Sequence, residues 1–118
     1  MRFWGKPAVP CWLYVIGAQN GSFAKVGISH NPDTRCKRLE DKTSIKLYVA
    51  MCVRTHHARL LEDTTKQMLK DNQITGEFFK CSPEAAIEAT KAAVRLICAR
   101  YPAWGNVYVD IDAGRRRF

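Results

Sequence analysis

Two apolar segments separated by an Asn-Gly pair lie near the start of the chain. Residues 11–17 have the sequence CWLYVIG and residues 23–29 have the sequence FAKVGIS. Both are rich in the aromatic and β-branched residues that favour strands. Asn20-Gly21 stands between them, and this dipeptide is a strong short-range signal for a hairpin. The sequence therefore predicts two adjacent antiparallel strands, from which a sheet can grow.

The rest of the chain alternates between helical and extended patterns. A helix is predicted to begin at Pro32, with Ser29 or Asn31 as its cap and Asp33 favourable in its first turn. The further predicted elements are a strand over 44–54 with one buried face, a helix over 55–72 with Met68 on its inner stripe, an extended segment within 75–82, a helix over 83–100 with Ser82 as its cap, and an edge strand within 106–118.

These elements predict one α+β domain over residues 1–118, with a small three-stranded antiparallel sheet flanked by helices. Its core is expected over about 11–80, followed by the C-terminal helix over about 83–100 and a basic tail over 113–118. The length of 118 residues suits a single hydrophobic core, and there is no repeat or low-complexity linker.

The charge balance favours a polyanionic partner. Nineteen Lys and Arg residues oppose eleven Asp and Glu residues, which gives a net charge of +8, and each phosphate that such a surface neutralises releases counterions. Five widely spaced cysteines without a CxxC pair indicate a reducing compartment. The N-terminal apolar run is short and is broken by Pro7 and Pro10, so we expect a soluble, cytoplasmic protein without a membrane span.

Four polar residues stand where the predicted fold would bring them together. Tyr14 and Lys25 lie on the two strands of the hairpin, and Arg35 lies in the first turn of the following helix. Glu62 lies close in angle to the inner stripe of the helix over 55–72. A carboxylate in that position must be paired, bound to a metal or directed into a cleft.

The segments LYVIG, KVGISHNPDTR, LLEDTTKQML and GEFF, in this order and spacing, resemble the GIY-YIG nuclease superfamily over about residues 12–80. Tyr14 takes the tyrosine position of the first motif, Gly27 and Arg35 stand at the family spacing, and Glu62 matches the metal-binding glutamate. Lys25 replaces the second tyrosine, as in a small phage and bacterial branch. The resemblance implies a three-stranded sheet and hydrolysis of DNA phosphodiesters with one Mg²⁺ or Mn²⁺.

The implied chemistry assigns a role to each of these residues. Arg35 would bind phosphate oxygens, Glu62 would hold the metal, and Lys25 would favour the phenolate of Tyr14 so that it serves as general base. His57 is an alternative base or a surface residue at the helix start. The expected nucleic-acid-binding residues are Arg35, Arg38 and Lys42, which share one helix face.

Two alternatives to a metal-dependent DNA endonuclease remain open. One is a catalytically inactive module that binds DNA or RNA on the same fold, since the second tyrosine is absent and only one metal-binding carboxylate is expected. The other is an accessory protein that binds a protein partner through its basic face.

Overall fold

The hairpin expected at the Asn-Gly pair is present in the computed structural model, which describes residues 11–101 and the backbone of residues 108–112. Strands β1 (Cys11–Ala18) and β2 (Ala24–Ser29) pair antiparallel. Gly21 adopts a φ of 79° in the turn. The Asn20 side chain accepts a hydrogen bond from the Ser22 backbone N–H at 2.9 Å, which stabilises the turn locally.

The sheet is larger than the sequence predicted. It has six antiparallel strands in the order β4-β5-β2-β1-β3-β6, so the three predicted strands form its centre. The additional strands are β4 (Gln73–Thr75), β5 (Phe78–Phe79) and β6 (Tyr108–Asp112), and the third central strand is β3 (Leu47–Thr55). The expectation of a three-stranded sheet is therefore wrong, because β4 and β5 are too short to show a recognisable alternation.

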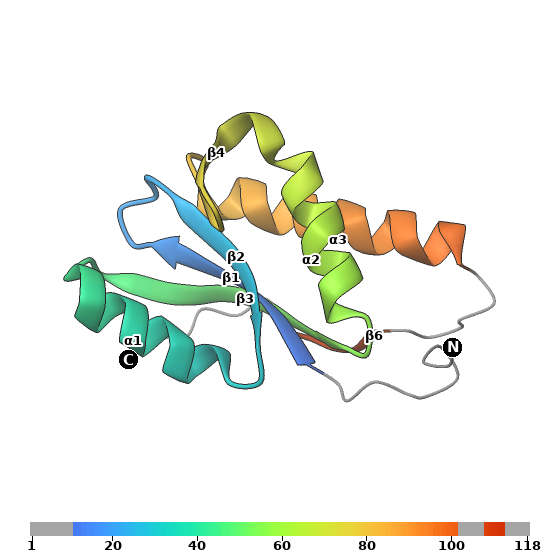
Figure 1. Ribbon diagram of the computed structural model, residues 1–118, viewed down its shortest axis with the longest axis horizontal. Coiled ribbons are helices and arrows are strands. Elements are labelled where there is room, and N and C mark those ends of the chain that lie inside the picture. Colours follow the sequence, from blue (N-terminus) through green and yellow to red (C-terminus); the bar gives the residue numbers. More distant parts are fainter. Residues whose placement is uncertain (1–10, 102–107, 113–118) are drawn as a thin grey trace.

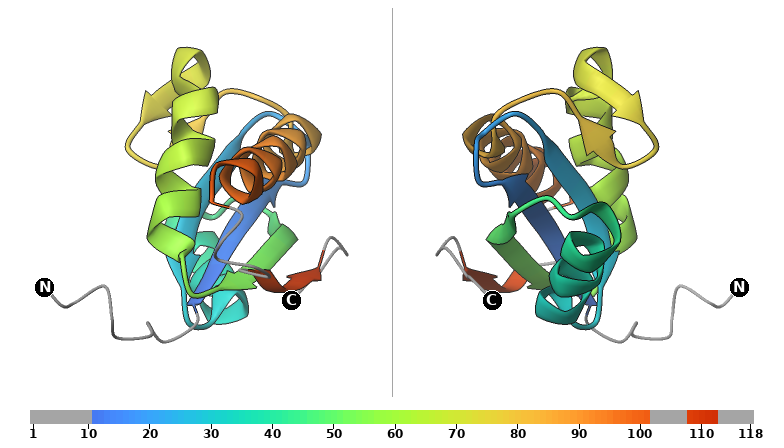
Figure 2. Two further views of the ribbon diagram at one scale, coloured as in Figure 1. Left: turned by 90° about the vertical axis from the view of Figure 1, so that its right-hand side faces the viewer. Right: turned by 90° about the vertical axis from the view of Figure 1, so that its left-hand side faces the viewer.

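Helices cover both faces of the sheet (Figure 1 and Figure 2). Helix α1 (Pro32–Thr43) packs on one face, whereas α2 (Ala58–Met68) and α3 (Pro83–Arg100) pack on the other. Asn31, one of the two caps expected for α1, and Ser82, the cap expected for α3, accept backbone hydrogen bonds through their side chains. The architecture is α+β, with the hairpin lying between two layers of helix.

The second helix is shorter than the predicted span of 55–72. Thr55 ends β3, and its hydroxyl oxygen accepts a hydrogen bond from the backbone N–H of His57, which is the cap residue of α2. After Met68 the chain tightens into a 3₁₀ turn, η2 (Lys70–Asn72). Met68, which was expected on the inner stripe, is exposed because the helix ends there.

Strand β3 is buried on both faces, which contradicts the expectation of a single buried face. Its pairing with β1 shifts register between Val15 and Ile16, so that β3 contains one extra residue at Ala50. The bulge changes the alternation: Leu47 packs in the core beside α1, whereas Met51 packs in the core beside α2 and α3. Apolar residues are therefore needed at nearly every position of the strand.

Further observations concern the ends of the chain, its cysteines and its helices. The expected edge strand is confirmed as β6, while the basic tail over 113–118 lies outside the described residues. Cys36 and Cys52 are buried as small apolar groups, whereas Cys98 is exposed. Among the helices of the described part, none is long and apolar enough to span a bilayer.

Candidate functional site

Tyr14 crosses the sheet directly over Gly27, the glycine of the second motif. The two residues are paired in the β1–β2 register, and the Tyr14 side chain is 1% exposed. A Cβ atom at Gly27 would lie 2.7 Å from Cζ of Tyr14 and 2.7 Å from Oε1 of Glu77. Only glycine leaves room for the phenol ring and the carboxylate, so this position fixes the place of both.

Lys25 lies on the same sheet face as Tyr14, one register step away. It pairs with Ile16, which lies two residues after Tyr14 in β1 and therefore on the same face. Lys25 is thus a diagonal neighbour of Tyr14 across the antiparallel pair. Its ammonium donates a hydrogen bond to the Tyr14 hydroxyl at 2.8 Å and forms an ion pair with Glu77. Lys25 is 3% exposed, so a charged group is held inside the protein by these partners.

The surroundings of Lys25 destabilise its positive charge. Burial, followed by the charges of Arg35 and Lys66, lowers the pKa of Lys25 from 10.5 to about 8, and the charge of Glu62 acts in the opposite direction. The contact with Glu77 also favours the protonated form. Lys25 thus combines a pKa close to neutral pH with a direct hydrogen bond to a phenol.

The pKa of Tyr14 is raised, which contradicts the expected lowering by Lys25. Burial is the largest cause, because it disfavours the phenolate. Arg35 lowers the pKa of Tyr14 through a hydrogen bond and through its charge, and Glu62 raises it. The cation that counteracts burial is therefore Arg35, and Lys25 is the group of the pair that titrates at the lower pH.

Helix α1 carries the basic residues that were predicted to contact nucleic acid. The Asn31 cap accepts a hydrogen bond from the Thr34 backbone N–H at 3.1 Å, which fixes the first turn from which Arg35 extends. Arg35, Arg38 and Lys42 are all exposed. Their spacing of three and four residues keeps them on one side of the helix, and Arg35 interacts with Tyr14 through a hydrogen bond and through its charge.

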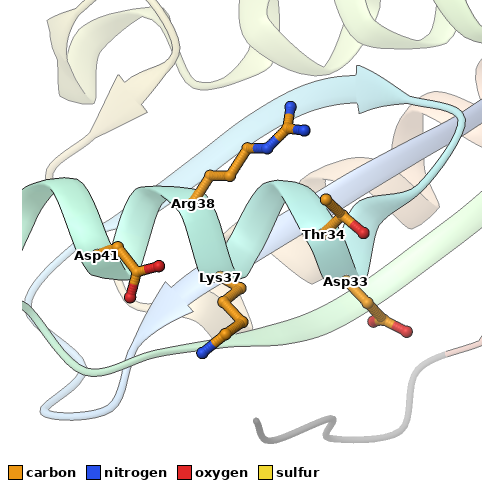
Figure 3. A pocket seen from close by; sticks show the side chains of 5 residues that line it. All are labelled: Asp33, Thr34, Lys37, Arg38 and Asp41. Atoms are coloured by element: carbon orange, nitrogen blue, oxygen red, sulfur yellow. The ribbon is translucent and has the colours of Figure 1, made fainter.

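A shallow hollow of about 340 Å³ lies along α1 itself (Figure 3). Its lining residues are Asp33, Thr34, Lys37, Arg38 and Asp41. Arg38 and Lys37 point to different sides of the helix. The hollow shares Arg38 with the predicted nucleic-acid-binding residues. Tyr14, Lys25 and Glu62 do not line it, so it is a feature of the α1 surface and does not contain the Tyr14–Lys25 pair.

Glu62 is connected to the cluster through a chain of ion pairs. It is 7% exposed on α2, which confirms its expected place on the inner side of that helix. Its Oε2 lies 3.1 Å from the ammonium of Lys66, and the same ammonium lies 3.9 Å from Oε2 of Glu77. Since Glu77 also pairs with Lys25, alternating charges run from the hairpin to α2.

His57 lies at the start of α2, where it is the cap residue of the helix. Burial and then the charge of His56 lower the pKa of His57. The groups that shift the pKa of Tyr14 and Lys25 do not include His57. Its assignment as an alternative base therefore stays a prediction from sequence.

A comparison with protein-family models gives a match over residues 12–98, which is well over half of the chain. The matching family is the T5orf172 domain. The chain belongs to this family. The T5orf172 domain is associated with endonuclease-type proteins of phages and bacteria, which indicates a nuclease-related or DNA-binding role. Membership of the GIY-YIG superfamily stays a prediction. Comparisons with curated proteins and with solved structures gave no match.

Two charged residues of this T5orf172 domain were missed as members of the site. Glu77 follows Gly76 at the β4–β5 turn and reaches Lys25 because β5 pairs with β2. Such a two-residue strand leaves almost no sequence signal. Lys66 was identifiable, since it follows Glu62 by four residues on the same helix, a spacing that brings opposite charges together.

Glu62 and Glu77 are the carboxylates near Lys25 and Lys66 that could hold a divalent cation. Within residues 11–101 no group of three or more His, Cys, Asp or Glu side chains gathers in a metal-binding arrangement. Mg²⁺, however, usually keeps several waters and binds through one or two carboxylates together with substrate phosphate. Glu62 and Glu77, which already share one cation in Lys66, fit this minimal pattern.

Proposed function

We propose that this protein is a metal-dependent endonuclease that hydrolyses DNA phosphodiester bonds, with GIY-YIG-type chemistry. The observation that carries the proposal is the buried hydrogen bond between Lys25 and Tyr14, next to Arg35 and within electrostatic range of Glu62. A lysine that is 3% exposed and has a lowered pKa is costly to the fold. Perturbed groups of this kind concentrate where chemistry is performed.

The Tyr14–Lys25 pair supplies the general base. The pair can act as a base only after one of its two groups has lost a proton. Lys25, with a pKa of about 8, is the group that loses its proton first. The neutral amine then accepts the phenolic proton of Tyr14 through their 2.8 Å hydrogen bond. The phenolate takes a proton from water, the resulting hydroxide bonds to phosphorus, and the bond to the 3′ oxygen breaks. The leaving 3′ oxygen takes a proton from solvent, and the ammonium of Lys25 releases one to solvent, which regenerates the pair.

The remaining residues bind and neutralise the phosphate. Arg35 offers paired N–H donors to the nonbridging oxygens, and its exposed position on α1 lets it reach a DNA backbone. Arg38 and Lys42 continue the positive face along the helix and contact neighbouring phosphates. Glu62 would hold Mg²⁺ or Mn²⁺, which supplies Lewis-acid stabilisation of the leaving 3′ oxygen.

Cleavage of supercoiled plasmid, branched DNA and RNA in Mg²⁺ or Mn²⁺ tests this proposal. We expect the parent to cleave DNA only with a divalent cation, and Glu62→Gln to lose cleavage while DNA binding is retained. Glu88→Gln is the matched control, because Glu88 is 70% exposed on α3 and pairs only loosely with Lys91. Equal activity of parent and Glu62→Gln would contradict the assignment of Glu62.

A nucleic-acid-binding module without turnover is the second candidate. The observation that favours it is the 3.1 Å ion pair between Lys66 and Glu62, which gives the carboxylate a cation of its own. Salt-dependent DNA or RNA binding without metal-dependent cleavage of any substrate would support this function.

A further inference from the structure

One ammonium group lies between two carboxylates that come from different parts of the fold. Lys66 Nζ is 3.1 Å from Oε2 of Glu62 on α2 and 3.9 Å from Oε2 of Glu77 at the β4–β5 turn. Glu62 precedes Lys66 by four residues, the favourable order for an ion pair within a helix. A positive charge is therefore stabilised at the position between the two carboxylates.

The surroundings keep both carboxylates directed at this position. Glu62 is 7% exposed and is held by α2, which is packed on the sheet and on α3. Glu77 is fixed at its other oxygen, since Oε1 pairs with the buried ammonium of Lys25. Two carboxylates arranged in this way repel each other unless a cation lies between them.

Lys66 differs from Lys25 in being able to leave its position. Its side chain is 26% exposed, so the flexible stem has a route to solvent, whereas Lys25 is 3% exposed. A strongly hydrated ammonium at the end of a four-carbon stem regains water when it swings outward. The interactions it gives up are the 3.1 Å pair with Glu62 and the longer 3.9 Å pair with Glu77. Lys66 is partly exposed in both pairs, and solvent weakens ion pairs of this kind.

We propose that Lys66 is a resident counter-ion of the metal position, which a divalent cation must displace in order to bind Glu62 and Glu77. This inference rests on the proposed function, because it concerns the cation that the nuclease would use. It adds Glu77 as a second carboxylate of that position and gives Lys66 the role of a competitor. The ammonium keeps the two carboxylates together in the absence of the ion and weakens the affinity for it.

Manganese binding without DNA tests the inference independently of cleavage. Free Mn²⁺ is measured by electron paramagnetic resonance while the full chain is titrated, at physiological ionic strength. We expect Lys66→Met, which keeps the stem and removes the charge, to bind Mn²⁺ roughly three- to tenfold more tightly than the parent, as expected for loss of a partly exposed ionic competitor. Lys66→Arg keeps the charge and should stay near the parent.

Lys91→Met is the matched control for the change in net charge. Lys91 forms a helical ion pair with Glu88 at 3.7 Å on α3, so its removal alters total charge in the same way. Because long-range effects of exposed charges are screened at this ionic strength, its Mn²⁺ affinity should equal that of the parent. Unfolding curves of each variant establish that all are folded under the binding conditions.

The outcomes separate this inference from the proposed function. Tighter binding by Lys66→Met alone supports the inference. Binding equal to or weaker than that of the parent, the same gain in Lys91→Met, or no Mn²⁺ binding by any variant would overturn it. The proposed function is tested separately by metal-dependent cleavage, so it can fail while Lys66→Met still gains Mn²⁺ affinity, and it can hold while that gain is absent.

Discussion

The buried charge of Lys25 makes stability depend on pH in a way that one substitution isolates. Its pKa is about 8 in the fold and about 10.5 in the unfolded chain. Between these values the unfolded chain binds more protons, so stability rises with pH there and the full cost of the charge is present below about pH 8. At 1.36 kcal/mol per pKa unit, this cost is on the order of 3 kcal/mol.

Lys25→Met removes this dependence. Near neutral pH the variant avoids the cost of burying the charge but loses the contacts with Tyr14 and Glu77, an offset of about 1–3 kcal/mol. The decisive quantity is the change with pH. We expect the stability of the parent, relative to the variant, to increase by on the order of 2–3 kcal/mol between about pH 7 and pH 10.

Urea unfolding of parent and variant at steps across this range measures the difference. Taking the difference cancels the titration of other groups, such as the Cys36 thiol, whose pKa burial raises to about 12. Lys46→Met is the matched control for the loss of one lysine, since Lys46 is exposed before β3. A constant difference between the parent and Lys25→Met would refute the lowered pKa and the proton relay built on it.

Three further predictions concern the geometry and chemistry of the cluster. Gly27→Ala places a methyl group against the Tyr14 ring and should cost about 1–3 kcal/mol in thermal unfolding; unchanged stability would contradict the close crossing. Tyr14→Phe should lower the cleavage rate by ~10²–10⁴-fold at unchanged DNA affinity, and a variant that cleaves like the parent would move the base to His57. Arg35→Ala should weaken both cleavage and binding and flatten the slope of log K against log[salt] by ~0.9 for a lost phosphate contact; an unchanged slope would mean that Arg35 does not contact DNA.

Local signals predicted much of the fold correctly. The hairpin at Asn20-Gly21 and the caps at Asn31 and Ser82 depend on residues within a few positions of each other, and all three are present. The interactions that stabilise these features join residues that are close in sequence, so a sequence pattern is sufficient to predict them. The same holds for Glu62, whose burial follows from its angle on an amphipathic helix.

Features that depend on distant pairing were not predictable in this way. The bulge at Ala50 shifts the alternation of β3, and it is defined only by the pairing of β3 with β1 between Val15 and Ile16. The strands β4 and β5 have three and two residues, too few for a periodic signal, and they are held in the sheet by the pairing of β4 with β5 and of β5 with β2. A pattern of apolar residues cannot reveal which other segment will satisfy a strand's hydrogen bonds.

The electrostatics of the candidate site also divide into a part that depends on local sequence and a part that depends on the packed structure. The proximity of Tyr14 and Lys25 was predicted, because it needs only a hairpin with the correct register. The raised pKa of Tyr14 was not, because it depends on the amount of protein packed over the phenol. Charge types can be read from a sequence, whereas desolvation is a property of the packed structure.

The small β4–β5 hairpin has a consequence for how the site responds to motion. It joins the sheet through two register pairs, Ala24 with Phe79 and Lys25 with Phe78, and turns at Gly76. Glu77 sits on this hairpin and balances two ammonium groups on different elements. Opening of this short hairpin would move the Glu77 carboxylate away from both lysines at the same time. A local motion of two strands would therefore change the electrostatic environment of Lys25 and Lys66 together.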